Sequence, residues 1–195
     1  MKDEIEEGGR ISDTFTRSDT LLSLCGLNCS LCPMFVRGSC IGCRAGSWCA
    51  TNCHIAPCSV DHGNFDYCFE CPEYPCTRYE GIDQRDSLIS HRNQLKDMEK
   101  ARTLGIEAYH EEQERNVKLL HELLDSYDDG GRDVFFCLAA NMLGIDDLRS
   151  AIEDADNAAT GKDIHAKADY VEEKLRQVAT ERDIPLELRQ SDEPW

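Results

Sequence analysis

The fold is decided between residues 25 and 76, which read CGLNCSLCPMFVRGSCIGCRAGSWCATNCHIAPCSVDHGNFDYCFECPEYPC. This stretch holds eleven of the twelve cysteines of the chain and few aliphatic residues from which to build a hydrophobic core. An interaction other than hydrophobic burial is therefore expected to hold it together. The eleven cysteines are Cys25, Cys29, Cys32, Cys40, Cys43, Cys49, Cys53, Cys58, Cys68, Cys71 and Cys76.

The spacing of these cysteines indicates metal binding. Thiolates bind soft or borderline cations, and two cysteines separated by two residues can both reach one metal ion from a tight turn. Glycines and prolines, which form such turns, lie throughout the stretch. We interpret it as a metal-bearing module and take all eleven cysteines as candidate ligands. The pairs with this spacing are Cys29/Cys32, Cys40/Cys43 and Cys68/Cys71.

The charge of the chain restricts its partners. Its 195 residues carry a formal net charge of -17 at pH 7, which disfavours nucleic acid and acidic membrane surfaces. A nucleic-acid-binding zinc finger needs a basic stripe, yet the cations between residues 20 and 81 are Arg37, Arg44 and Arg78. We therefore expect no nucleic-acid partner and no membrane partner. Another protein remains a candidate partner, and the oligomeric state is left open.

A disulfide framework is the main alternative for so many cysteines, and it is typical of secreted proteins. Residues 1–19 are acidic and polar and lack the apolar segment of a signal peptide. The chain also has no apolar run long enough to span a bilayer. These features favour a reducing cytoplasm in which metal ions hold the thiolates.

The composition changes after Gly81, where amphipathic helical patterns replace the cysteines. The predicted fold is a small, metal-stabilised, cysteine-rich module, irregular with few short strands or turns, followed by a mainly α-helical domain. The predicted units are a disordered acidic lead-in (1–19), the cysteine-rich module (20–81) and the helical domain (82–195). Helices are predicted over 86–104, 106–127, 134–143 and 146–155 and from 164 onward, with a short edge strand or extended tail over 184–188.

The cysteine spacing is compatible with two kinds of metal centre. Structural zinc takes four thiolates, or three with a histidine, and eleven cysteines with His54 or His62 would complete three such sites. An iron–sulfur cluster is the alternative, because Cys40-x-x-Cys43 followed by Cys49 and Cys53 loosely resembles a ferredoxin run. The gap between Cys43 and Cys49 departs from the bacterial spacing, and zinc is favoured.

A catalytic interpretation starts from Cys25, Cys29 and Cys32, whose spacing matches the cluster triplet of radical S-adenosylmethionine enzymes. Those enzymes need a large α/β barrel, whereas this chain has no series of alternating strands and helices. The interpretation is disfavoured on that ground.

The same residues carry a resemblance to a known family. The segments Cys25–Cys32, Cys40–Cys43 and Cys68–Cys76 are similar to the signature of the cysteine-rich proteins called domain of unknown function 3795. The resemblance extends over about residues 22 to 115. It implies a bacterial or archaeal cytoplasmic protein whose cysteines bind metal, with zinc as the expected ion. It implies no activity.

The leading functional hypothesis is a zinc-binding module with structural metal that works by binding another protein. A redox protein or enzyme with an iron–sulfur cluster bound by a subset of Cys25–Cys76 is the alternative, and metal storage or sensing is a third. Whether the protein is an enzyme stays open, and no catalytic residue is assigned. Cys137 is expected to be a small buried hydrophobic residue. The aromatic residues are expected to cover the metal site: Trp48, Phe65, Tyr67, Phe69 and Tyr74.

Overall fold

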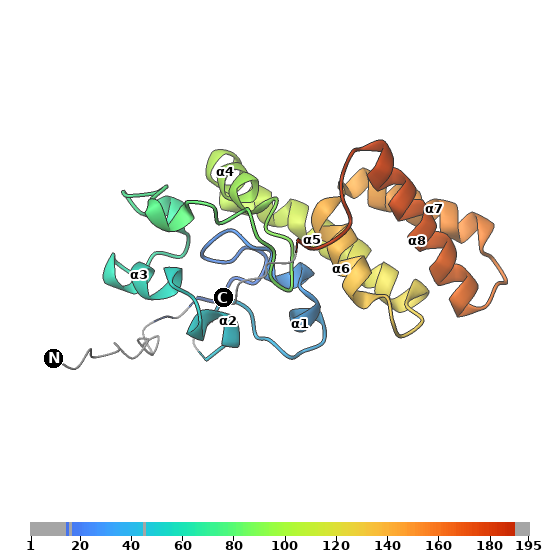
Figure 1. Ribbon diagram of the computed structural model, residues 1–195, viewed down its shortest axis with the longest axis horizontal. Coiled ribbons are helices and arrows are strands. Elements are labelled where there is room, and N and C mark those ends of the chain that lie inside the picture. Colours follow the sequence, from blue (N-terminus) through green and yellow to red (C-terminus); the bar gives the residue numbers. More distant parts are fainter. Residues whose placement is uncertain (1–14, 16, 45, 190–195) are drawn as a thin grey trace.

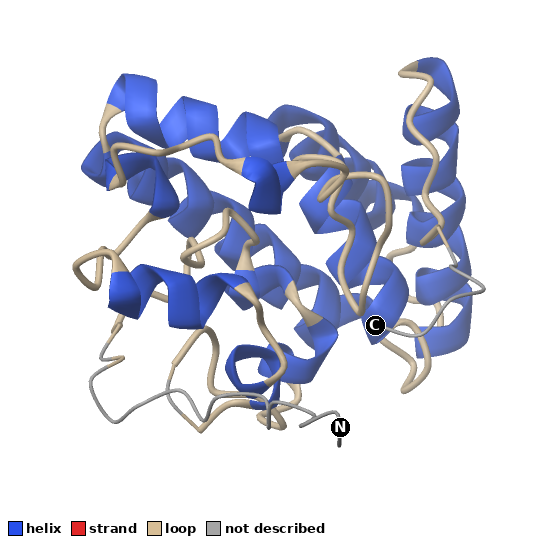
Figure 2. Cartoon of the chain, turned by 60° about the vertical axis from the view of Figure 1, so that its left-hand side comes forward, coloured by secondary structure: helices blue, strands red, loops and turns tan. Residues whose placement is uncertain are grey.

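The computed structural model describes residue 15 and residues 17–44 and 46–189. Helices connected by turns and loops make up this part of the chain, as Figure 2 shows, and it contains no β-strand. The mainly helical fold class is therefore confirmed for residues 82–189, but the few short strands expected in the cysteine-rich module are not present in its described part. Short helices and turns take their place.

The cysteine-rich module is built from short helices of one or two turns. Proline at the first position of α1 and the Ser47 side chain, which accepts the Ala50 N–H at 3.1 Å, start two of these turns. Glycines with positive φ, such as Gly38 and Gly42, separate them. The elements are η1 (Cys29–Leu31), α1 (Pro33–Val36), α2 (Trp48–Thr51), α3 (Ile55–Asp61), η2 (Cys68–Glu70) and η3 (Thr77–Tyr79).

Five longer helices follow: α4 (Gln94–Leu104), α5 (Ile106–Tyr127), α6 (Asp133–Met142), α7 (Ile145–Ala158) and α8 (Ile164–Glu181). The predicted helix over 106–127 has the observed bounds of α5. Gly105, at φ 89°, is the single residue that separates it from α4. The predicted helix over 146–155 is longer in the structure, and Asp163 caps α8 by accepting the Ala166 N–H.

Two sequence-based details differ from the structure. Residues 134–143 are apolar nearly all round, which suits a helix buried on every side. In α6, however, Val134 is 41 % exposed although Phe136 and Ala140 are inaccessible. The helix predicted from residue 86 begins only at Gln94. The Asp86 side chain explains the delay, because it accepts the His91 N–H at 2.8 Å and the Ser90 hydroxyl at 3.2 Å and so stabilises a loop.

The apolar tail after α8 forms no strand. Ile184 and Leu186 pack against the C-terminal helices, and the tail is held to Asp86 by Arg189, whose guanidinium lies 2.8 Å from that carboxylate. Burial opposes ionisation of Asp86, but the bonds from Arg189 and from the His91 N–H outweigh it and lower the pKa of Asp86 to about 2. The extended-tail alternative is the one observed.

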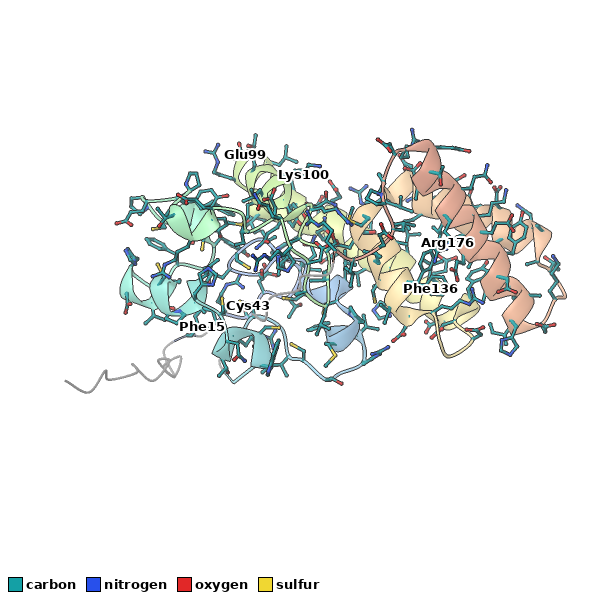
Figure 3. The ribbon with its side chains drawn as sticks, viewed as in Figure 1. Phe15, Cys43, Glu99, Lys100, Phe136 and Arg176 are labelled. Atoms are coloured by element: carbon teal, nitrogen blue, oxygen red, sulfur yellow. The ribbon has the colours of Figure 1, made fainter. Side chains whose placement is uncertain are left out.

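Two hydrophobic clusters divide the described residues. The first joins the cysteine-rich module to α4 and the start of α5, and includes Phe15, Met98 and Tyr109. The second lies among α5, α6, α7 and α8, around Phe136, and also includes Leu31 of the module. In Figures 1 and 3 the module and α4 lie on the left with Phe15, and α6 to α8 lie on the right with Phe136, while α5 runs between them. Helix α5 therefore belongs to both clusters.

The predicted lead-in over 1–19 lies mostly outside the described residues. Of its described members, Phe15 is buried, and Arg17 donates to the Leu22 carbonyl at 3.0 Å. Asp19 accepts the Tyr67 hydroxyl at 2.7 Å. Residues 15–19 thus include side chains packed on the module, while the domain limits stay predictions. Within the described residues, no helix is both long and apolar enough to cross a bilayer.

Gly26 allows the module to approach α4 closely. It adopts φ 101°, and a Cβ there would lie 2.3 Å from Met98 Cγ and 2.7 Å from the Gln94 carbonyl oxygen. The Gln94 side chain in turn donates to the Cys25 carbonyl at 3.0 Å. The loop that carries Cys25 is therefore fixed directly on the helix.

We expect Gly26→Ala to lower the free energy of unfolding by about 3 kcal/mol, because a positive φ costs about 1–2 kcal/mol and overpacking costs a similar amount. Denaturant unfolding measures the loss. Gly38→Ala is the matched control, because Gly38 also has a positive φ but a Cβ there meets no atom within 4 Å. Equal losses in the two variants would contradict the close contact with α4.

A polar cluster beside this contact makes stability depend on pH. The Asn28 amide donates to Asp97 at 2.9 Å and accepts the Tyr109 hydroxyl at 2.8 Å. Burial raises the pKa of Asp97 to about 7, against 3.8 for an ordinary aspartate. Because the folded-state pKa is raised, the folded chain holds a proton that the unfolded chain releases between these two pH values.

Stability is therefore expected to fall as the pH rises from about 4 to about 7 and to level off above that range. Asp97→Asn should flatten this part of the profile and raise the free energy of unfolding near pH 8 by about 1–2 kcal/mol. Denaturant unfolding across the pH range measures both effects. An unchanged slope in the variant would show that Asp97 is not the titrating group.

Candidate metal centre

All twelve cysteines are free thiols, and the eleven predicted ligands lie together in the module. Cys49 is exposed, whereas the other ten are partly buried. Cys137 belongs to α6 and has 1 % of its surface exposed, which confirms that it is buried, and Cys32 of the module is its thiol neighbour. Figure 3 shows Cys43 within the half of the molecule that the module forms.

The first thiol group consists of Cys25, Cys29, Cys43 and Cys53. Burial, with repulsion from Cys53 and Cys43, raises the pKa of Cys25 to about 12. Burial and the neighbouring Cys43 and Cys25 likewise raise the pKa of Cys29. These interactions require proximity, so three segments of the chain, around Cys25 and Cys29, Cys43, and Cys53, bring four thiols to the same region.

The second thiol group consists of Cys32, Cys40 and Cys49. Burial, then repulsion from Cys40 and Cys32, raises the pKa of Cys49 to about 11. Burial also raises the pKa of Cys32, which has Cys40 as its thiol neighbour. The group adjoins the first one, because Cys43 also acts on Cys49.

The third thiol group lines one pocket of about 30 Å³ and consists of Cys58, Cys68, Cys71 and Cys76. Helix α3 carries Cys58, the turn η2 begins at Cys68 and ends before Cys71, and Cys76 precedes η3. Burial is the main cause that raises the pKa of Cys68 to about 12, and repulsion from Cys76 adds to it. Cys53 is also a neighbour of Cys68, so this group adjoins the first.

Backbone N–H groups are directed at several of these sulfurs. Gly42 N lies 3.4 Å from Cys40 Sγ, and Ile55 N lies 3.3 Å from Cys53 Sγ. The N–H groups of Met34 and Phe35 act in the same way on Cys32 and partly oppose the rise of its pKa. An N–H donor two residues after a cysteine favours the negative sulfur, because a thiolate accepts hydrogen bonds far better than a thiol does.

The thiols are neighbours but do not form finished coordination shells. Among the described residues, no three Cys, His, Asp or Glu side chains converge closely enough to hold a metal ion. Neutral thiols do not attract one another and thiolates repel, so only a cation draws four sulfurs to bonding distance. The geometry corresponds to ligands gathered by the fold that would still have to close by side-chain rotation.

Two of the predicted cysteine pairs are divided between the first and second thiol groups. Cys43 acts on Cys25, Cys29 and Cys53, and Cys40 acts on Cys32, while Cys49 is a neighbour of both Cys40 and Cys43. Cys29 and Cys32 divide in the same way, although they still interact weakly. Cys68 and Cys71 stay together at the pocket.

The two candidate histidines occupy different surroundings. His54 Nε2 lies 3.5 Å from the Arg78 carbonyl oxygen. His62 lines the pocket of the third thiol group, and its Nδ1 lies 2.8 Å from the Cys58 carbonyl oxygen and 3.5 Å from Cys58 Sγ. His62 is thus placed beside a thiol of the third group.

Aromatic rings cover the third thiol group. Phe65 and Tyr74 line the pocket as expected, while Tyr67 and Phe69 stack on each other with 5.1 Å between ring centroids. Tyr79, which the sequence did not single out, also lines the pocket and packs edge-on against Tyr74 at 4.9 Å. Its only sequence signal was its position three residues after Cys76.

Comparison with known proteins gives one match. A family model described as "Protein of unknown function (DUF3795)" matches residues 34–81, which include eight of the eleven clustered cysteines. Cys25, Cys29 and Cys32 precede the matched segment. No curated protein and no solved structure matches the chain. The resemblance of the cysteine-rich module to this family is therefore confirmed over residues 34–81.

Proposed function

We propose that the cysteine-rich module binds metal ions through its eleven thiols and that zinc is the resident ion. The observation that carries the proposal is that backbone N–H groups point at the sulfurs of neighbouring thiols. Gly42 N lies 3.4 Å from Cys40 Sγ, and Ile55 N lies 3.3 Å from Cys53 Sγ. Such donors stabilise negative sulfur, and hydrogen bonds to thiolate ligands are a regular feature of metal–sulfur sites.

The energetics of the module support the same proposal. Burial raises the pKa of Cys25 and Cys68 to about 12, so without a cation these thiols stay protonated and contribute little cohesion. A bound divalent cation replaces the protons and supplies about 10–16 kcal/mol per structural zinc site at neutral pH. A module made of short helices and turns, with few aliphatic residues for a core, requires a stabilising free energy from such a source.

Zinc and iron–sulfur chemistry make different demands on these thiols. A closed set of four thiolates suits structural zinc, and the first and third thiol groups each contain four. Four thiolates also hold an iron–sulfur cluster, so the alternative is a cluster bound by a subset of Cys25–Cys76. The second thiol group, with three cysteines, would need a further ligand for a closed site.

Elemental analysis and a visible spectrum of protein purified without oxygen test the proposal. We expect a colourless protein with about two or three zinc ions per chain, because each closed site takes four ligands. A brown protein with iron and acid-labile sulfide would support the cluster instead. A folded protein that binds neither metal would overturn metal binding itself.

Cys43→Ser tests whether the metal is structural. We expect the variant to lose about one zinc ion and to lower the free energy of unfolding of the module by several kcal/mol, because it removes a ligand from the first thiol group. Cys137→Ser is the matched control, since it alters a buried cysteine outside the module and should leave the zinc content unchanged. A metal-replete, equally stable Cys43→Ser protein would count against a structural role.

In this proposal the metal acts as a scaffold, and the module works by binding another protein. Trp48, 67 % exposed, and Ile41, 51 % exposed, supply apolar surface directly beside Cys49 and Cys40 in the chain. Substitution of these two exposed side chains is the first test of whether the module binds another protein. The cytoplasmic location expected from the sequence stays a prediction.

A further inference from the structure

Resting on the proposed function, we propose that Cys58, Cys68, Cys71 and Cys76 form one discrete site for a tetrahedral, thiolate-preferring divalent cation. In this site the Tyr79 hydroxyl donates a hydrogen bond to the Cys68 sulfur. The site is separate from the one that the first thiol group forms. Tyr79 acts as a positioning residue that does not touch the metal.

The pocket supplies the room for such a site. Its volume of about 30 Å³ exceeds what one water molecule occupies on the same measure, about 10–15 Å³, so a single ion fits. Apart from His62, Ser59 and Arg78, the residues that line the pocket present an almost wholly apolar surface. An apolar wall around sulfur ligands excludes competing water and strengthens the metal–thiolate attraction.

The local backbone brings the four sulfurs to the pocket. The Cys71 N–H donates to the Cys68 carbonyl at 3.1 Å, which closes the tight turn η2 and places two cysteines on one knuckle. Glu70 fastens the start of that turn, because its carboxylate accepts the Tyr67 N–H at 3.2 Å. Cys58 and Cys76 enter from α3 and from the start of η3, so three chain segments meet at the ion.

Tyr79 provides the independent observation that points to a charged sulfur. Its side chain is 6 % exposed, and its hydroxyl is buried without a hydrogen-bond partner. The Cys68 thiol lines the same pocket and is its neighbour there. A buried hydroxyl without a good acceptor costs about 1–3 kcal/mol, and a metal-bound thiolate is the acceptor that removes this cost.

His62 supports the site without serving as its ligand through Nδ1. The Cys58 carbonyl oxygen can only accept a hydrogen bond, so Nδ1 at 2.8 Å carries the proton and cannot bind a cation at the same time. Its Nε2 lies 3.7 Å from Glu73 at the surface. The imidazole therefore caps the last turn of α3 at Cys58, and the proposed ligand set is the four sulfurs.

Cobalt(II) is the probe for the test, because four thiolates around it give intense charge-transfer and tetrahedral d–d bands. We expect Cys71→Ser to lose about one cobalt ion relative to the wild-type chain, and the double variant Cys71→Ser/Cys43→Ser to lose about two. A double variant that loses no more than either single variant would show that the two groups share a site, which overturns the proposal.

Tyr79→Phe retains all the cysteines, so it tests the proposed site even if a cysteine variant unfolds. We expect it to keep the full cobalt count, to shift the thiolate-to-cobalt band and to weaken the affinity of one site about 10-fold, as loss of an outer hydrogen bond does. Tyr109→Phe is the matched control, since Tyr109 is a buried tyrosine of the same cluster that bonds to Asn28 away from the pocket. An unshifted band in Tyr79→Phe overturns the role of Tyr79.

These outcomes separate the two proposals. Wild-type protein that takes up no cobalt would mean that the module does not bind metal, and the proposed function would fail with the site. Wild-type protein that takes up cobalt, together with a Cys71→Ser chain that keeps all of it while folded, would overturn this site alone. The circular-dichroism signal of α4 to α8 reports whether each variant is folded.

Discussion

Crowding of sulfur is the constraint on which the module depends. Eleven thiols lie close together in one half of the chain. Burial, together with repulsion between neighbouring thiolates, raises the pKa values of Cys25 and Cys68 to about 12 and so favours their protonated, neutral form. Yet N–H groups two residues after Cys40 and Cys53 face their sulfurs, which favours negative charge. Negative sulfur at close quarters is tolerable only around a cation, and that requirement favours metal over free thiols.

The longer helices give this module a platform. Helix α4 lies against Gly26, α5 contributes Tyr109 to the same cluster, and α5 continues into the second cluster with α6, α7 and α8. Side chains on α4 and α5 also bond to each other through Lys100 and Glu112 at 2.5 Å. The loop around Cys25 and Cys29 is therefore anchored by packing that needs no metal, and the turn η2 of the third thiol group also contacts α4.

The sequence predicted the parts whose signal is local and periodic. The stripe from Ile106 to Tyr127 gave α5 its bounds, and the eleven cysteines marked the module. It could not predict which thiols meet, because two-residue spacing describes a turn and not the side to which each sulfur points. Cys43 is a neighbour of Cys29 and Cys40 is not named among the neighbours of that thiol, although both act on Cys49. The sequence also did not indicate Tyr79, because its position beside Cys68 depends on the turn that follows Cys76 and not on a spacing pattern. The late start of α4 follows from Asp86, whose side-chain bonds compete with helix.

The separation of Cys40 from Cys43 also bears on how metal would act on the chain. If each pair bound its own ion, every ion would brace one short turn and leave the turns free to move against one another. Ligands drawn from Cys25, Cys29, Cys43 and Cys53 would instead join three segments across the module. Closing long loops removes more conformational freedom from the unfolded chain than closing short ones. The arrangement observed thus makes a bound ion a tertiary link, which suits a module with little secondary structure of its own.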